Sequence, residues 1–397
     1  MTDMIIKNTR PMAGPKADIR IKGGRIAEIG PDIAPQGEPV EDAAGALALP
    51  GFVEAHTHLD KSLIGWPWYH NDVGNELLDM IANERAVKKE WGIDPHVQSM
   101  RHALQTVAYG ATVIRSHVDI DTEGKLRPLE GVMKTAELLS DVVEIETVAF
   151  PQSGLMIRDG TTDLMDQAMT MGADVVGGLD PCGVDRDPKG HLDFIFNLAE
   201  KHGKPIDIHL HEPGEMGAFS MEMILDRTEA LSMAGQVTVS HAFCLGMPDP
   251  VRVAGLVERL ARNDVRIMTT APASSEAPAV MQLREAGIKV GAGNDGIRDT
   301  WGPYGNGDML ERAKFIGLRN NFRRDTEVAL AFDVCSTGGA EAMNVEPPKL
   351  EVGARGDVVV VKGESLAHAV VTHAPRHLVV KAGKVTARNG AALTEAP

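Results

Sequence analysis

Short apolar runs alternate with longer amphipathic stretches through the middle of the chain. Eight runs rich in Val, Ile and Ala predict strands, at residues 53–58, 111–119, 142–150, 174–179, 205–211, 236–242, 265–270 and 289–294. Between most of them, apolar residues recur at the i, i+3, i+4 spacing of a helix, as in residues 95–109, 191–202, 221–234, 250–263 and 279–286. Eight strands that alternate with helices predict an α/β fold, a (β/α)8 TIM barrel, with a doubly wound open sheet as the alternative.

Both ends of the chain have a different pattern, in which short apolar strands flank tight turns. Near the N-terminus, strands are predicted at residues 4–6, 17–21 and 25–29, with a hairpin turn at residues 22–24. Near the C-terminus, strands are predicted at residues 357–361, 369–372 and 377–380, followed by a turn at residues 381–384. Two β-rich ends therefore flank the alternating middle.

The composition suits a large folded protein with small-molecule partners. Of the 397 residues, 43% are hydrophobic and 24% are charged, which is enough apolar surface for a sizeable core. The net charge of -16 repels phosphates, so nucleic acid polymers and anionic membranes are poor candidate partners. The three cysteines stand too far apart to indicate a disulfide framework or a Cys-based zinc site. Because no apolar run approaches the length of a membrane span and no leader pattern begins the chain, we expect a soluble, cytoplasmic protein.

Side chains that bind metals or move protons stand at the carboxyl ends of the predicted barrel strands. They are His56 and His58, His117 and Asp119, Gln152, Asp180, His209 with His211 and Glu212, His241, and Asp295. A barrel of this kind carries its active site at that end. The accumulation of such residues there therefore predicts an active site.

A metal site is predicted within this set. His56 and His58 are two residues apart, so on a strand their imidazoles point to the same side. His209 from the fifth strand and Asp295 from the eighth would complete a shell of three imidazoles and one carboxylate. Such a shell, with one position left for water, suits a catalytic Zn or Fe(II) ion. A single histidine at a strand end is more often structural, and it is the H-x-H pair that favours metal ligation.

Several short motifs in a fixed order carry a family resemblance. Residues 50–58 (PGFVEAHTH), followed by His209, His241 and Asp295, resemble the amidohydrolase superfamily. Within it, the chain is similar to the cytosine deaminase branch, through HTHLD at 56–60, RSHVD at 115–119, FPQSG at 150–154, DIHLHE at 207–212 and VSHA at 239–242. It is also similar to the N-alkylammelide amidohydrolases of triazine breakdown, through HLDKS at 58–62, VGGLDP at 176–181 and GNGDM at 305–309.

The resemblance implies a small β-sandwich, formed by both termini, beside the barrel. We expect residues 1–48 and 346–397 to form the sandwich and residues 49–345 to form the catalytic barrel. Superfamily members with two metals bridge them through a carboxylated Lys on the third or fourth strand. This sequence has no Lys in either predicted strand, so one divalent ion is expected. We also expect a homo-oligomer.

The resemblance further implies hydrolytic deamination of a small aminated heterocycle, such as cytosine, isocytosine or a related pyrimidine. Water activated by the metal attacks the ring carbon that bears the amine, and ammonia leaves. Asp295 would take the proton of the water, His241 would polarise the attacking oxygen, and Glu212 would protonate the ring nitrogen and the leaving amine. The expected substrate contacts are Gln152, Trp301, His211 and Lys61.

Two departures from the cytosine deaminase pattern leave the substrate open. Gly296 stands where those enzymes carry a second acidic residue, and Asn294 stands where they carry a histidine. The alternative is an amidohydrolase that releases an alkylamine from an N-alkylaminotriazine of the ammelide type, or that opens a cyclic amide. A non-catalytic metal- or ligand-binding barrel is the second alternative. Glu212 and His241 count against it, because a storage site needs no acid–base pair.

Overall fold

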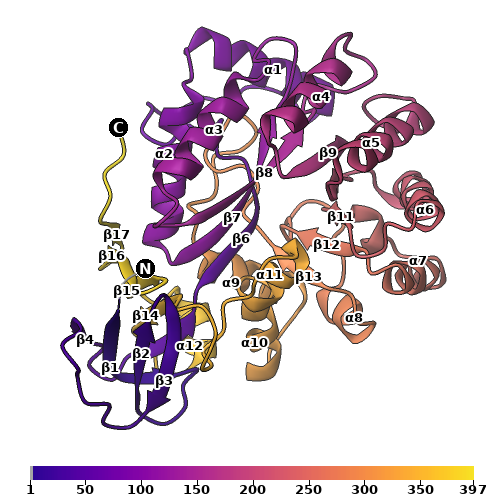
Figure 1. Cartoon of the computed structure of the whole chain (residues 1–397). Helices are drawn as coiled ribbons and strands as arrows, with labels where there is room; N and C mark the ends of the chain where they lie inside the picture. Colours follow the sequence, from indigo (N-terminus) through magenta and orange to yellow (C-terminus); the bar gives the residue numbers. More distant parts are fainter. Residues whose placement is uncertain (1–2) are drawn as a thin grey trace.

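Eight parallel strands form the centre of the molecule. In the computed structural model, which describes residues 3–397, they are hydrogen-bonded in sequence order from β6 to β13. Their bounds are β6 Phe52–Thr57, β7 Ala111–Asp119, β8 Glu144–Phe150, β9 Val175–Leu179, β10 Ile206–His209, β11 Val237–Ser240, β12 Arg266–Thr269 and β13 Val290–Ala292. Most of their residues are buried, because helices cover the outer side of the strands (Figure 1) and side chains fill the inside.

The first and last of these strands meet. The Asp295 amide donates to the His56 carbonyl at 2.9 Å, and Thr57 forms a parallel bridge with Asp295. This approach requires glycine at position 293, where a Cβ atom would lie 2.3 Å from the His56 carbonyl oxygen and 2.6 Å from its amide nitrogen. The sheet therefore closes on itself, and the predicted TIM barrel is confirmed over the open sheet.

Three of the barrel helices begin where an aspartate precedes a proline. Asp94, Asp187 and Asp249 each accept hydrogen bonds from first-turn amides, which starts α2, α5 and α7. The helices of this layer are α1 Leu77–Glu90, α2 Pro95–Ala108, α3 Arg127–Leu138, α4 Thr161–Met171, α5 Pro188–His202, α6 Gly214–Ala230, η1 Phe243–Gly246, α7 Pro250–Arg262, α8 Val280–Glu285, α9 Met309–Arg319, α10 Asp325–Asp333 and α11 Thr337–Met343. All the helices predicted from periodicity are present among them, within four residues at their ends except for α6, which begins seven residues before the predicted start at 221.

Both termini meet in a second sheet, seen at the lower left of Figure 1. Its strands are β1 Met4–Pro11, β2 Ala17–Lys22, β3 Arg25–Gly30, β4 Val40–Asp42, β5 Leu47–Pro50, β14 Val358–Val361, β15 Arg376–Lys381, β16 Lys384–Arg388 and β17 Ala391–Ala392. The N-terminal β5 pairs antiparallel with the C-terminal β14, and the two halves enclose an apolar core that includes Ile6, Ile19 and Val380. The small β domain expected from both termini is therefore confirmed.

The domain boundaries expected from the sequence stay a prediction. The boundary at residue 48 falls within β5, and the boundary at residue 345 follows α11. The first two residues of the expected N-terminal segment lie outside the described residues.

The strand predicted at residues 369–372 is wrong, because this segment is part of a helix, α12 Leu366–Thr372. Ser365 starts the helix, since its hydroxyl accepts a hydrogen bond from the His368 amide at 3.1 Å. Ala369 and Val370 are buried, and α12 packs against α9 and α10. A short apolar run fits either a strand or one buried helix face, and the capping serine was the local signal that distinguished them.

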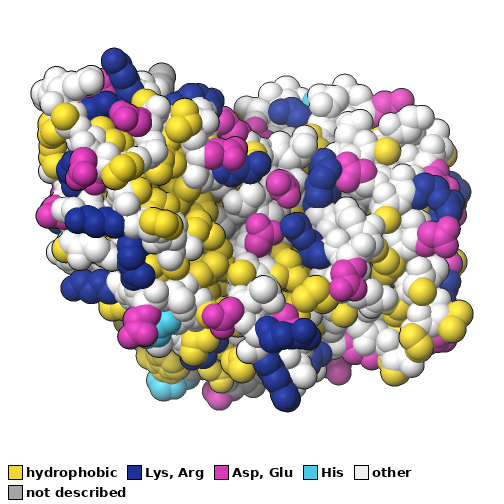
Figure 2. All heavy atoms as spheres, turned by 90° about the horizontal axis from the view of Figure 1, so that it is seen from below, with side chains coloured by type: hydrophobic (Ala, Val, Ile, Leu, Met, Phe, Trp, Pro, Cys, Tyr) yellow, Lys and Arg dark blue, Asp and Glu magenta, His cyan; other side chains and the backbone are white. Residues whose placement is uncertain are grey.

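The surface mixes charges of both signs with local apolar areas. Figure 2 shows hydrophobic side chains gathered on the lobe at the left, the side on which the terminal sheet lies in Figure 1. The exposed apolar side chains of the terminal segments include Met12, Val40, Val352, Val371 and Leu393. Within residues 3–397, helices with the length and apolar character of a membrane span are absent. The expected homo-oligomer stays a prediction.

Candidate active site

Side chains from the carboxyl ends of the strands line one cavity. Its volume is about 380 Å³, which is in the range of small-molecule sites. The lining residues include Lys61, Gln152, His58, His209, His211, Asp295, Asp299, Trp301 and Arg312. Two further expected site residues, His56 and His241, lie within 4.0 Å of Asp295. The fold therefore brings nearly all the predicted site residues to one place.

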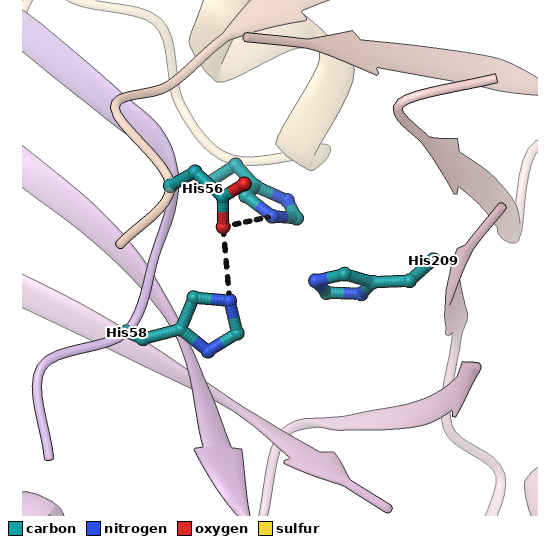
Figure 3. A group of neighbouring side chains, drawn as sticks. His56, His58 and His209 are labelled. Atoms are coloured by element: carbon teal, nitrogen blue, oxygen red, sulfur yellow. Dashed lines mark ion pairs between the residues drawn. The ribbon is translucent and has the colours of Figure 1, made fainter. Parts of the chain in front are cut away.

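Three imidazoles and one carboxylate converge beside this cavity. Nitrogen and oxygen atoms of His56, His58, His209 and Asp295 all lie within 4.8 Å of one another. Asp295 Oδ1 is 3.1 Å from His58 Nε2 and 3.6 Å from His56 Nε2. Figure 3 shows the three imidazoles turned toward a common space, with dashed lines for these two pairs. Burial would raise the pKa of Asp295, but its contacts with the two histidines outweigh burial and keep that pKa well below its usual range.

The four side chains fit a divalent cation. His56 Nε2 and both ring nitrogens of His209 are buried without a hydrogen-bond partner among the described residues, a costly arrangement unless a ligand takes them. Burial, aided by the charge of Lys61, lowers the pKa of His58 to about 4, and burial lowers the pKa of His209 well below its usual range. These two imidazoles are therefore neutral at pH 7, the form that binds metals.

Hydrogen bonds behind two of the histidines select the tautomer that a metal needs. The Ser240 hydroxyl donates to Asp207 Oδ1 at 2.6 Å, so His56 Nδ1, 3.0 Å from the same hydroxyl oxygen, is the donor to it. His58 Nδ1 lies 3.1 Å from the His117 carbonyl and also donates. Each Nε2 atom is then unprotonated and faces the cluster, as is typical of metal-binding histidines. These roles of Ser240 and Asp207 were not predicted from the sequence, although Ser240 directly precedes His241.

The backbone is left-handed at three of the strand ends. Asp180, His241 and Asp295 have φ angles of 35°, 67° and 65°. Non-glycine residues seldom adopt such angles, and they cluster at functional sites. The His241 turn brings its Nε2 atom to 4.0 Å from Asp295 Oδ2, and the His241 and His211 rings lie 4.1 Å apart between centroids.

Glu212 and its neighbour His211 face different surroundings. Glu212 Oε1 accepts hydrogen bonds from the amides of 182–183 at 2.7 and 2.8 Å, and its other oxygen accepts one from the Ser220 hydroxyl. Glu212 is buried, which raises its pKa, and it does not line the cavity. His211 does line the cavity. Burial would lower the pKa of His211, but Asp180, 2.7 Å from its Nδ1, outweighs burial and raises that pKa.

Lys61 is buried in a network of ion pairs on one wall of the cavity. Its Nζ lies 3.1 Å from Asp119 Oδ1 and 3.1 Å from Glu84 Oε2, and it donates to Gln152 Oε1 at 2.6 Å. The indole N–H of Trp301 donates to the same Glu84 oxygen. Glu84 on α1, which was not predicted from the sequence, thus links Lys61 and Trp301, and Lys61 in turn holds Gln152.

Asn294, one of the two departures from the cytosine deaminase pattern, is firmly anchored. Its Nδ2 donates to Glu54, whose pKa burial raises to about 7, and its Oδ1 lies 3.3 Å from Arg312 Nη2, the donor. Both ends of the carboxamide are therefore occupied by protein groups. Asn294 therefore holds Arg312 at the cavity wall. A histidine at position 294 would instead offer an imidazole to a ligand.

Comparison with known proteins places the chain in a family. The amidohydrolase family profile matches residues 94–387. The chain is 32% identical over 399 residues to N-isopropylammelide isopropyl amidohydrolase of Pseudomonas sp. (strain ADP), covering 98% of each protein. The solved structure of N-isopropylammelide isopropylaminohydrolase from Burkholderia multivorans is 48% identical, with a TM-score of 0.96 over 99% of this chain and 100% of that one. The 5-methylcytosine deaminase of Klebsiella pneumoniae shares the fold, at 24% identity and a TM-score of 0.83 over 97% of each chain. The chain therefore belongs to the amidohydrolase family.

Proposed function

We propose that the protein hydrolyses the bond between an aminotriazine ring of the ammelide type and an alkylamino substituent, and so releases the alkylamine. The observation that carries this proposal is the 48% identity, along the whole chain, to a solved N-isopropylammelide isopropylaminohydrolase. Deamination of cytosine, isocytosine or a related pyrimidine, the function expected first from the sequence, has weaker support, because the cytosine-type relative is only 24% identical.

The proposed cofactor is one divalent ion, Zn or Fe(II), bound by His56, His58, His209 and Asp295. Three imidazoles and one carboxylate suit either metal. β8 and β9 contain no lysine that could bridge a second ion. When bound, such an ion supplies an activated water molecule for attack on the substituted ring carbon.

Asp295 is the proposed acceptor of the proton from the attacking water. Asp295 Oδ2 and His241 Nε2 are 4.0 Å apart, so both groups can contact the same attacking oxygen. Neither ring nitrogen of His241 has a hydrogen-bond partner among the described residues. We therefore propose that His241 hydrogen-bonds the attacking oxygen and polarises it.

A proton donor is needed for the ring nitrogen and the leaving amine. Glu212 remains the proposed donor, and to reach the ring its carboxyl group has to leave Ser220 and turn toward the cavity. His211, which lines the cavity and is paired with Asp180, is the competing candidate. Glu212→Gln and His211→Asn distinguish them. The variant that loses turnover while it keeps its metal identifies the donor, and full turnover in Glu212→Gln would refute the role of Glu212.

Gln152, Lys61, Trp301 and His211 are the proposed contacts to the ring. Lys61 occupies Gln152 Oε1, which leaves Gln152 Nε2 as the group that can donate to a ring carbonyl. Glu84 occupies the indole N–H of Trp301, which leaves its aromatic face for stacking. This wall of the cavity therefore suits a flat heterocycle that carries carbonyl oxygens.

The test is an amine-release assay with metal-loaded protein. The panel contains N-isopropylammelide, ammeline, cytosine, isocytosine and 5-methylcytosine, and both isopropylamine and ammonia are quantified. We expect isopropylamine from N-isopropylammelide, full activity in the exposed control variant Glu200→Gln, and about one metal ion per chain. Ammonia from a pyrimidine without isopropylamine would replace our proposal with the deaminase. Metal binding without either product would favour the non-catalytic barrel.

A further inference from the structure

Gly296, the second departure from the cytosine deaminase pattern, leaves room for the carboxylate of another residue. A Cβ atom at position 296 would lie 1.9 Å from Asp299 Oδ2 and 2.9 Å from Asp299 Cγ. Any larger residue at 296 would therefore displace the Asp299 side chain. Asp299 also lines the cavity that holds the metal-ligand cluster. The chain thus brings an acid to the site from three residues farther along the loop.

The two oxygens of Asp299 have different surroundings. Oδ1 accepts hydrogen bonds from the Trp301 amide at 2.8 Å and the Gly302 amide at 3.1 Å, which fixes the orientation of the side chain. Oδ2 accepts no hydrogen bond from any of residues 3–397. Asp299 is only 6% exposed, so this unpartnered oxygen belongs to a nearly buried carboxylate. Because Asp299 lines the cavity, this oxygen is available to an N–H donor of a ligand.

The cavity wall that carries Lys61 offers a hydrogen-bond donor, which complements the acceptor on Asp299. Lys61 donates to Gln152 Oε1 at 2.6 Å, so Gln152 Nε2 remains a donor. The cavity therefore presents one amide donor and one carboxylate acceptor to a ligand. A ring carbonyl and a ring N–H, which the lactam edge of an oxo-substituted heterocycle carries side by side, are the partners that these two groups require. Burial raises the pKa of Asp299 to about 6, against the charge of Lys61, so the carboxylate is mostly ionised at pH 7.

We propose that Asp299 Oδ2 accepts a hydrogen bond from a ring N–H of the substrate, so that the enzyme selects rings that present an N–H beside a carbonyl. This inference rests on the proposed function and names the part of the ring that the site recognises. It assigns Asp299 to substrate specificity and explains the glycine at position 296.

The test measures equilibrium binding to the metal-loaded protein by calorimetry, with two flat triazines that need no turnover. Cyanuric acid carries ring N–H groups beside carbonyls, whereas the ring nitrogens of melamine are bare acceptors. Asp299→Ser keeps an acceptor for the two loop amides and removes Oδ2, and Asp299→Asn places a donor there. Gly296→Ala displaces the intact carboxylate. Asp72→Asn, an exposed acid on the neighbouring cavity that Asp299 also borders, is the control.

We expect each of the three variants to weaken cyanuric acid binding by about 10- to 100-fold, the range for a hydrogen bond to a charged group, while Asp72→Asn leaves it unchanged. Metal content should stay at the wild-type value in all the variants, and the melting temperature should stay there in Asp299→Asn and Asp72→Asn. Melamine binding should fall less, and in Asp299→Asn it should rise relative to cyanuric acid. Cyanuric acid binding within about threefold of wild type in the variants, an equal loss for melamine, or no binding by the wild type would overturn the inference. A lack of isopropylamine release would instead refute the proposed function.

Discussion

Replacing Ser240 with alanine tests whether the hydrogen bonds behind the histidines prepare the metal site. The Ser240 hydroxyl joins His56 Nδ1, 3.0 Å away, to Asp207 Oδ1, 2.6 Å away, and all three side chains are fully buried. Without the hydroxyl, the imidazole loses the acceptor that holds its proton on Nδ1. The tautomer with the proton on Nε2 then competes, and that tautomer cannot bind a metal through Nε2.

The expected loss of stability in Ser240→Ala follows from the hydrogen bonds that Asp207 and His56 keep. Asp207 keeps Arg115, whose Nη1 lies 2.9 Å from Asp207 Oδ2, so only one buried carboxylate oxygen and one imidazole N–H lose their partner. We therefore expect Ser240→Ala to cost about 1–3 kcal/mol of unfolding free energy. The loss of such a supporting contact should weaken metal binding by about 10- to 100-fold, or about 1.4–2.7 kcal/mol.

The assay is competition for Zn between the protein and a chromophoric chelator, with urea unfolding of the metal-free protein measured in parallel. Thr238→Ala is the matched control, because Thr238 is also buried and lies two residues earlier on β11, on the same side of the strand. We expect the control to keep the wild-type metal affinity. If Ser240→Ala binds Zn within about threefold of wild type although its stability falls, the proposed preparation of His56 is refuted.

Three further predictions follow from buried groups elsewhere. Glu84→Gln removes a carboxylate that lies 3.1 Å from both Lys61 and Lys88. We expect it to lower the free energy of unfolding in urea by about 3 kcal/mol or more and to raise KM. The exposed control variant Glu90→Gln should change neither quantity. Burial lowers the pKa of His102 to about 3 in the folded protein, against about 6.5 in the unfolded chain. The unfolded state therefore takes up the proton first as pH falls below 6.5, and the folded state loses stability. We expect His102→Gln to reduce the stability lost between pH 7 and pH 5 by about 2 kcal/mol. An unchanged pH dependence would show that His102 has the same pKa in the folded and in the unfolded protein. Gly293→Ala puts a methyl group 2.3 Å from the His56 carbonyl oxygen, so calorimetric melting and metal titration should show losses of both stability and metal.

Local patterns were sufficient for the fold class and for the membership of the candidate metal cluster. A strand or a helix imposes its own period on the apolar positions, so eight alternations could be counted along the chain. The H-x-H spacing works for the same reason, because residues two apart on a strand share one side. The ends of parallel strands must meet, so His209 and Asp295 could be assigned to the same site as His56 although they are distant in sequence.

The hydrogen-bond partners of buried side chains, by contrast, depend on contacts between helices, strands and loops. The spacing of apolar residues along the chain does not indicate these contacts. Glu212 follows the predicted metal ligand His209, but its carboxylate accepts hydrogen bonds from Ser220 and from a loop near residue 182. Its neighbour His211 is the one that lines the cavity. Asp299 reaches the site only because the loop folds back over Gly296. Sequence spacing encodes which way a residue points on its own element. Which buried donor meets which acceptor is settled by how the elements pack, because each buried polar group must find its partner in three dimensions.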